Sequence, residues 1–128
     1  MLLLLLLLSR EQVRSATSST WPALVSATQT VLAEICVVGN REESSKFVTQ
    51  KLLALTRKRR AQLRANAVDS LRSVVARIKE EFLPLLPETV PFLAELLEDA
   101  DQRVEDATQA LLQDLEQLSG ESLKPYLQ

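Results

Sequence analysis

Apolar residues recur along most of the chain at the three- and four-residue spacing of a helix, not in the alternation typical of a strand. Five stretches carry such a stripe. Their apolar positions are Ala23, Ala27, Val31, Ile35 and Val38; Phe47, Val48, Leu52 and Leu55; Leu63, Ala67, Leu71, Val74, Val75 and Ile78; Val90, Leu93, Ala94 and Leu97; and Val104, Ala107, Leu111, Leu115 and Leu118. The pattern therefore predicts five amphipathic helices, each with one face in a shared core.

Capping and turn-forming residues separate the predicted helices. The boundary positions are Thr20 as a cap, Gly39-Asn40 as a stop, Lys58 to Ala61 as a short basic turn, Pro87 in a first helical turn, Asp99 to Gln102 as a capping turn, and Gly120 as a final stop. Pro91 is expected to bend the helix that contains it. Tyr126 and Leu127 are expected to close the last repeat.

The helical pattern repeats with a period near forty residues. A shift of 41 places Leu52 on Leu93 and Leu71 on Leu112. A repeat of that length made of two helices is typical of HEAT and armadillo proteins, whose hairpins stack into a solenoid. We therefore expect an all-α fold, an α-solenoid of HEAT/armadillo-like helical hairpins ending in a C-terminal capping repeat. An ordinary helical bundle is the alternative.

The period divides the chain into three parts. Residues 1–40 form a helical N-terminal segment, residues 41–80 a HEAT-like repeat with a basic turn, and residues 81–128 a terminal acidic HEAT repeat and tail. The polyleucine run Leu2 to Leu8 is far shorter than the roughly 20 residues that cross a bilayer. We expect a helix whose leucines pack on an upstream element, with no membrane partner, and a secretory signal is the less favoured alternative.

Composition excludes most enzyme classes. The chain has 26 leucines and 13 alanines, but no histidine, one cysteine and two glycines. Without histidine it has no Ser-His-Asp triad, Cys-His pair or conventional zinc site, and its two distant glycines build no phosphate-binding loop. We therefore expect no enzyme, no cofactor and no small-molecule substrate. Cys36, among apolar neighbours, is interpreted as a small core residue in a reducing compartment.

Charge is strongly segregated although the net charge is only -2. Residues 46–79 carry ten basic side chains and one acid, whereas residues 80–116 carry eleven acids and one base. The two blocks either present two electrostatic faces to partners or are merely solvated faces that attract one another, and both interpretations remain open.

The sharpest local feature is the basic turn, which consists of Arg57, Lys58, Arg59, Arg60 and Arg64. Such a knob can neutralise RNA phosphates, act in nuclear import or protein contact, or simply remain solvated or pair with the acidic block. It contains no aromatic residue, so base stacking is not expected. Reversing the charges of Arg57, Arg59 and Arg60 is expected to weaken association and flatten its salt dependence.

The acidic residues near the predicted turn at 99–102 invite a metal hypothesis. Glu95, Glu98, Asp99 and Asp101 are carboxylates in a short stretch. Helix capping and complementarity to the helix dipole explain acids at such a turn without a metal. We therefore expect no metal site here.

The run Leu85-Leu-Pro-Glu-Thr-Val-Pro-Phe-Leu-Ala-Glu-Leu-Leu-Glu-Asp99 resembles the last HEAT repeat of the family of HEAT-repeat-containing protein one and U3 small-nucleolar-RNA-associated protein ten. The family-like motif positions are Leu85, Pro87, Glu88, Pro91, Phe92, Leu93, Leu96 and Asp99. The ending Leu118 to Tyr126 and the stretch Lys51 to Leu71 are also similar. The resemblance covers residues 46–127, so this chain resembles only the C-terminal end of a much longer protein.

The resemblance implies a non-catalytic scaffold in the nucleolus. The family belongs to the small-subunit processome, which acts with the U3 ribonucleoprotein in pre-rRNA processing and 18S rRNA maturation. The partners it implies are processome proteins and the U3 ribonucleoprotein, with contact to pre-rRNA. A HEAT-type protein-interaction adaptor without RNA dependence is the alternative.

Overall fold

A computed structural model describes residues 21–37 and 40–127. The predictions for the leucine run at 2–8, for the Thr20 cap and for a stop at Gly39 lie outside these residues. The helices are α3 (Trp21–Ile35), α4 (Arg41–Leu55), α5 (Ala61–Ile78), α6 (Leu86–Leu96) and α7 (Gln102–Ser119), with 3-10 helices η1 (Lys79–Leu85) and η2 (Lys124–Tyr126). All regular elements in the described ranges are helical, which confirms the all-α fold class.

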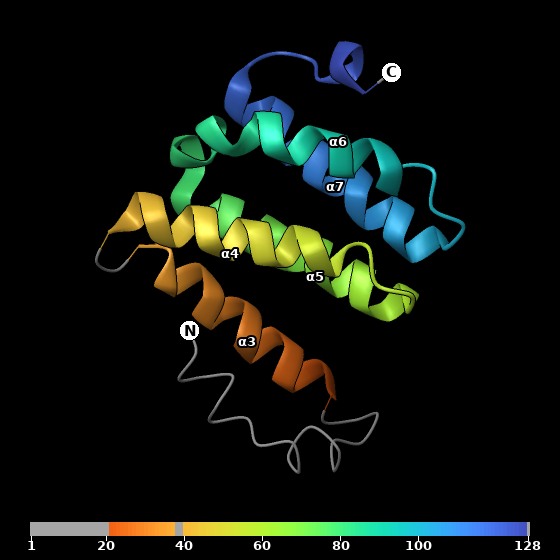
Figure 1. The fold of residues 1–128 in the computed structure, drawn as a ribbon, viewed down its shortest axis with the longest axis horizontal. Coiled ribbons are helices and arrows are strands. Elements are labelled where there is room, and N and C mark those ends of the chain that lie inside the picture. Colours follow the sequence, from red (N-terminus) through yellow and green to blue (C-terminus); the bar gives the residue numbers. More distant parts are fainter. Residues whose placement is uncertain (1–20, 38–39, 128) are drawn as a thin grey trace.

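Helix α5 lies at the centre of the molecule. It packs against α3, α4 and α7, and α6 packs in turn against α7. In Figure 1 the α4–α5 hairpin lies between α3 and the α6–α7 hairpin, so the described helices form successive levels. The hairpins stack on one another, and their arrangement as a solenoid stays a prediction.

The core is built where these levels meet. Its largest fully buried side chains include Phe82, Leu71, Leu93, Leu111 and Leu115. Burying each from water contributes about 1.5–3 kcal/mol. Cys36 is fully buried in the same cluster, and burial raises the pKa of its thiol. The interpretation of Cys36 as a core residue is confirmed.

Local capping chemistry sets several helix ends. The Asn40 side chain accepts a hydrogen bond from the Glu43 N–H and caps the start of α4. The prediction that Asn40 helps to end the preceding helix is therefore wrong, because it is the N-cap of the next one. Asp101 caps α7 by accepting from the Arg103 N–H, as expected from the 99–102 turn. Gly120 ends α7 with φ +74°, a left-handed conformation that favours glycine.

Some predicted stripe residues face solvent instead of the core. Phe47, Leu55 and Leu63 are 45%, 39% and 36% exposed, while Thr49 and Leu53 are buried in α4. Ala27 is exposed in α3, and Tyr126 is 64% exposed and does not close the fold. In the same regions Ala33 of α3 and Leu123, just before η2, are buried instead. Leu127 packs partly on the core. These errors arise because neighbouring hairpins, not helical spacing, decide how far a buried face extends.

Residues 79–85 contain a 3-10 helix that the pattern did not predict. It begins after α5, where Lys79 takes φ +53°, a conformation that L residues rarely adopt. The turn aims Phe82 into the core with no exposed surface. Thus η1 connects the two hairpins and anchors them.

Candidate interaction surface at the basic turn

The five sequence-predicted cations lie where α4 ends and α5 begins. Thr56 closes α4, its backbone N–H reaching the carbonyls of Leu52 and Leu53, and Arg60 is the N-cap residue of α5 without a side-chain cap bond. Arg57, Lys58 and Arg59 lie in the intervening turn. The local sequence therefore places a dense group of positive charge at one end of the α4–α5 hairpin.

Arg64 is occupied by contacts inside the molecule. Its Nε and Nη2 donate to the two Asp99 carboxylate oxygens at 2.8 and 3.0 Å, and its Nη1 donates to the carbonyls of Lys58 and Arg59 at 3.0 and 2.7 Å. The Arg64 and Asp99 side chains are only 18% and 10% exposed. The guanidinium lowers the pKa of Asp99, and the hydrogen-bonded carboxylate raises the pKa of Arg64. Arg64 thus clamps the basic turn onto the α6–α7 turn.

Arg57 also has intramolecular partners. It donates to both Glu95 oxygens at 3.1 and 2.9 Å, and its guanidinium lies 4.2 Å from the centre of the Phe92 ring. Arg57 and Glu95 are more than half exposed, so their pairing contributes at most about 1 kcal/mol. The sequence missed this aromatic contact because Phe92 comes from the next hairpin.

Three cations of the basic turn keep their side chains exposed. Within the described residues, Lys58, Arg59 and Arg60 form no side-chain hydrogen bond, ion pair or ring contact. The candidate surface therefore narrows from five residues to these three. Their contact with RNA or a partner stays a prediction.

The two charge blocks pair with one another across the hairpins. Arg72 of α5 donates to Asp114 of α7 at 2.8 Å, in addition to the pairs made by Arg57 and Arg64. Asp101 is bound by Arg103, which also reaches Gln62 of α5. The expectation that the blocks attract each other is supported for these pairs, and it explains part of the segregation without a ligand.

Arginine contacts also account for most of the acids considered as metal ligands. Arg57, Arg64 and Arg103 bind the carboxylates of Glu95, Asp99 and Asp101 respectively. Among the described residues no group of three acidic, cysteine or histidine side chains could hold a metal ion. No helix in this part of the chain is long and apolar enough to cross a membrane.

The family-like motif residues belong mainly to α6 and its ends. Leu85, Leu93 and Leu96 are buried. The others are Pro87 at the start of α6, Glu88 in its first turn, Pro91 inside it, Phe92 partly buried under Arg57, and Asp99 bound to Arg64. The motif therefore packs and positions the second hairpin against the basic turn.

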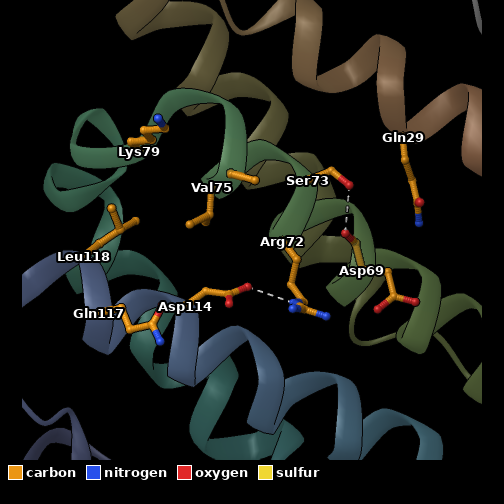
Figure 2. A pocket seen from close by; sticks show the side chains of 10 residues that line it. Gln29, Asp69, Arg72, Ser73, Val75, Lys79, Asp114, Gln117 and Leu118 are labelled. Atoms are coloured by element: carbon orange, nitrogen blue, oxygen red, sulfur yellow. Dashed lines mark hydrogen bonds and ion pairs between the residues drawn. The ribbon is translucent and has the colours of Figure 1, made fainter.

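A second surface, which the sequence did not predict, is an open groove of about 660 Å³. Figure 2 shows its lining side chains, which come from α3, α5 and α7 apart from Lys79 at the start of η1: Gln29, Asp69, Arg72, Ser73, Val75, Ala76, Lys79, Asp114, Gln117 and Leu118. Burial raises the pKa of Asp69, and the Arg72 charge opposes that rise. The groove is assembled from three helices, so no single stretch of sequence signals it.

Fold and surface together define the class: an all-helical protein of stacked hairpins with a charged turn. No known family profile matches the chain, and no solved structure matches it significantly. The chain is 43% identical over 82 residues to a HEAT repeat-containing protein 1 homolog of Drosophila melanogaster, and 34% identical over 95 residues to human HEAT repeat-containing protein 1. These alignments cover 64% and 74% of the chain.

A third relative is U3 small nucleolar RNA-associated protein 10 of Schizosaccharomyces pombe, 32% identical over 98 residues, or 75% of the chain. Over the matched residues the chain is similar to proteins named HEAT repeat-containing protein 1 and U3 small nucleolar RNA-associated protein 10. This confirms the resemblance. The chain spans only 4% to 6% of the length of these three relatives. Their names denote HEAT-repeat and RNA-associated proteins and no enzyme.

Proposed function

We propose that this chain acts as a non-catalytic scaffold in ribosome biogenesis. The observation that carries the proposal is its similarity to proteins named U3 small nucleolar RNA-associated protein 10. Besides the relative from Schizosaccharomyces pombe, one from Phaeosphaeria nodorum is 43% identical over 77 residues and one from Neurospora crassa is 32% identical over 97 residues.

In finer terms, the proposed place of action is the small-subunit processome in the nucleolus. Its partners there would be processome proteins and the U3 ribonucleoprotein, and its role would be in pre-rRNA processing and 18S rRNA maturation. Residues 41–80 and 81–128 would serve as two stacked HEAT repeats that present surfaces. The α4–α5 and α6–α7 hairpins, joined by η1, support that division.

The proposed contact is the exposed part of the basic turn. Lys58, Arg59 and Arg60 offer three adjacent positive charges that no carboxylate of residues 21–37 and 40–127 neutralises. Such a group attracts RNA phosphates or an acidic protein, with a strength that falls as salt rises. The acidic side of the molecule would face another protein.

The test is purification of the tagged 128-residue chain from nuclear extract, with and without ribonuclease. We expect U3 RNA and nucleolar processing proteins to co-purify. Loss after ribonuclease would indicate association through RNA, and retention would indicate a protein interface. Recovery of unrelated cytoplasmic adaptors alone would contradict the proposal and favour a general HEAT-type adaptor.

Charge variants connect this association to the turn. The triple variant Lys58→Glu, Arg59→Glu and Arg60→Glu should weaken recovery at least about tenfold and flatten its salt dependence. Arg57 is left intact because its reversal would also place two acids together beside Phe92. The matched control is the triple variant Lys46→Glu, Lys51→Glu and Lys124→Glu, three exposed lysines on α4 and η2. Equal recovery of both variants would overturn the role of the turn.

A further inference from the structure

We infer that the α4–α5 turn docks an acidic amphipathic polypeptide segment. This deepens the proposed function and rests on it, because it names the partner class for the same turn. The docking surface consists of Lys58, Arg59 and Arg60 together with two exposed leucines, Leu55 and Leu63. The observation behind it is that unpaired cations and exposed aliphatic side chains occupy a single turn.

The two leucines flank the cations directly. Leu55 is the last residue of α4 and is 39% exposed, and Leu63 lies in the first turn of α5 and is 36% exposed. The Lys58 N–H donates to the Leu55 carbonyl at 3.2 Å, and the Leu63 N–H donates to the Arg60 carbonyl at 3.1 Å. Each leucine is thus held one hydrogen-bonded turn from a cation.

The surface is fixed before any partner arrives. Arg64 holds the carbonyls of Lys58 and Arg59 from beneath, and its bidentate bond to Asp99 ties the turn to the second hairpin. The Arg57–Glu95 pair holds the other side. A partner that binds here does not have to order the backbone, so less of the binding free energy is lost on association.

The leucines favour a polypeptide over RNA. An RNA backbone needs cations, and unstacked bases stack on aromatic faces or on guanidinium faces such as those of Arg59 and Arg60, whereas the aliphatic side chains add little to either contact. In the nearest aromatic contact, the Arg57 guanidinium already lies over Phe92. An amphipathic helix presents leucines on one stripe and glutamates beside it, which complements three cations flanked by two leucines.

The experiment uses the full 128-residue chain and three labelled probes in fluorescence anisotropy. The first probe is an 18-residue peptide with leucines at helical i, i+3, i+4 and i+7 spacing and glutamates beside them. The second is its scrambled version with identical charge, and the third is a uridine oligonucleotide. We expect the amphipathic peptide to bind at least about tenfold more tightly than the scrambled one.

Two variants separate the apolar from the electrostatic part of the contact. Leu55→Ser with Leu63→Ser should weaken binding of the amphipathic peptide about tenfold and leave binding of the scrambled peptide unchanged. The charge-reversal triple variant should abolish binding of both peptides. The control Tyr126→Ser removes a more exposed apolar side chain outside the surface and should change neither. Circular dichroism checks that each variant keeps its helices.

Several outcomes would overturn the inference. Equal binding of the two peptides, no binding of either, or tighter binding of the oligonucleotide with no effect of the leucine variant would each contradict a docked polypeptide. These failures are distinguishable from failure of the proposed function. If U3 RNA co-purifies with the chain but the leucine variant binds the amphipathic peptide as tightly as the wild type does, the scaffold role stands and this partner class is ruled out.

Discussion

At the residue scale, neighbouring arginines in one turn have different roles because their surroundings differ. Arg64 lies against a nearly buried carboxylate and two backbone carbonyls, so it stabilises the fold. Arg57 has a carboxylate and a ring but remains in solvent, where screening limits its contribution. Arg59 and Arg60 contact no carboxylate or ring among the residues that the structure describes, so their charge is available to a partner.

Thr49 is a residue whose chemistry conflicts with its position. Its hydroxyl is fully buried in α4 and forms no hydrogen bond within the described residues. An unsatisfied buried hydroxyl costs free energy because its bonds to water are lost. We expect Thr49→Val to raise the free energy of unfolding by about 1 kcal/mol, measured by urea denaturation followed by circular dichroism.

Matched controls for that prediction are the other two fully buried threonines. Thr89 and Thr108 donate to the carbonyls of Leu85 and Val104 at 2.8 and 2.7 Å. Because their hydroxyls are satisfied, the same change to valine should leave stability unchanged or lower it by up to about 1 kcal/mol. Destabilisation by Thr49→Val as large as that by Thr89→Val would contradict the interpretation of the Thr49 hydroxyl as unsatisfied.

At the element scale, the 3-10 connection η1 begins with an unfavourable backbone conformation. Lys79 has φ +53° and ψ -124°, a region suited to glycine. We expect Lys79→Gly to stabilise the protein by about 1 kcal/mol, because relief of strain exceeds the extra flexibility that glycine gives the unfolded chain. Thermal and urea unfolding would measure the change.

The reverse substitution at the end of α7 tests the same principle. Gly120 has φ +74°, and a Cβ atom added there would meet no atom within 4 Å. Gly120→Ala should therefore destabilise by about 1 kcal/mol through backbone conformation alone. We therefore expect Lys79→Gly to raise the free energy of unfolding and Gly120→Ala to lower it. Destabilisation by Lys79→Gly would contradict the strain argument.

Local rules explain which elements could be predicted from the sequence. The Asp101 cap and the Gly120 stop depend on nearby backbone groups, so composition and spacing were sufficient. The exposure of Phe47 and Leu55 depends on where the next hairpin lies, which helical spacing does not encode. The basic turn could likewise be predicted from the sequence. Its arginines Arg57 and Arg64, however, pair with carboxylates 38 and 35 residues further along the chain, which local sequence does not indicate.

At the scale of the whole molecule, segregated charge couples one hairpin to the next. Three arginines of the basic block on α4, α5 and their turn pair with acids on α6, α7 and the turn between them, while Arg77 of α5 pairs with Glu34 of α3. The Arg64–Asp99 pair is the least exposed of these links. Because it is shielded from water and salt, it should contribute most of the pH-dependent coupling between hairpins.

Acid should therefore uncouple the hairpins. The Arg64 guanidinium lowers the pKa of Asp99 in the folded protein, so the unfolded chain takes up its proton at higher pH than the folded one. The stability from Asp99 is fully present above the ordinary aspartate pKa of about 3.9, and it is lost as pH falls through the lower folded pKa. Asp101 acts in the same direction, while Asp69, whose pKa is raised by burial, opposes it.

The variant Asp99→Asn tests whether this pair dominates the acid response. It should lower the free energy of unfolding at neutral pH by about 2 kcal/mol, since it leaves Arg64 without its charged acceptor. It should also flatten the fall in stability below the ordinary aspartate pKa, as measured by urea denaturation at a series of pH values. Asp69→Asn removes an opposing group, so it should leave that fall at least as steep as in the wild type. If the stability of Asp99→Asn falls at acid pH as steeply as that of the wild type, the more exposed pairs, not the Arg64–Asp99 pair, hold the two hairpins together.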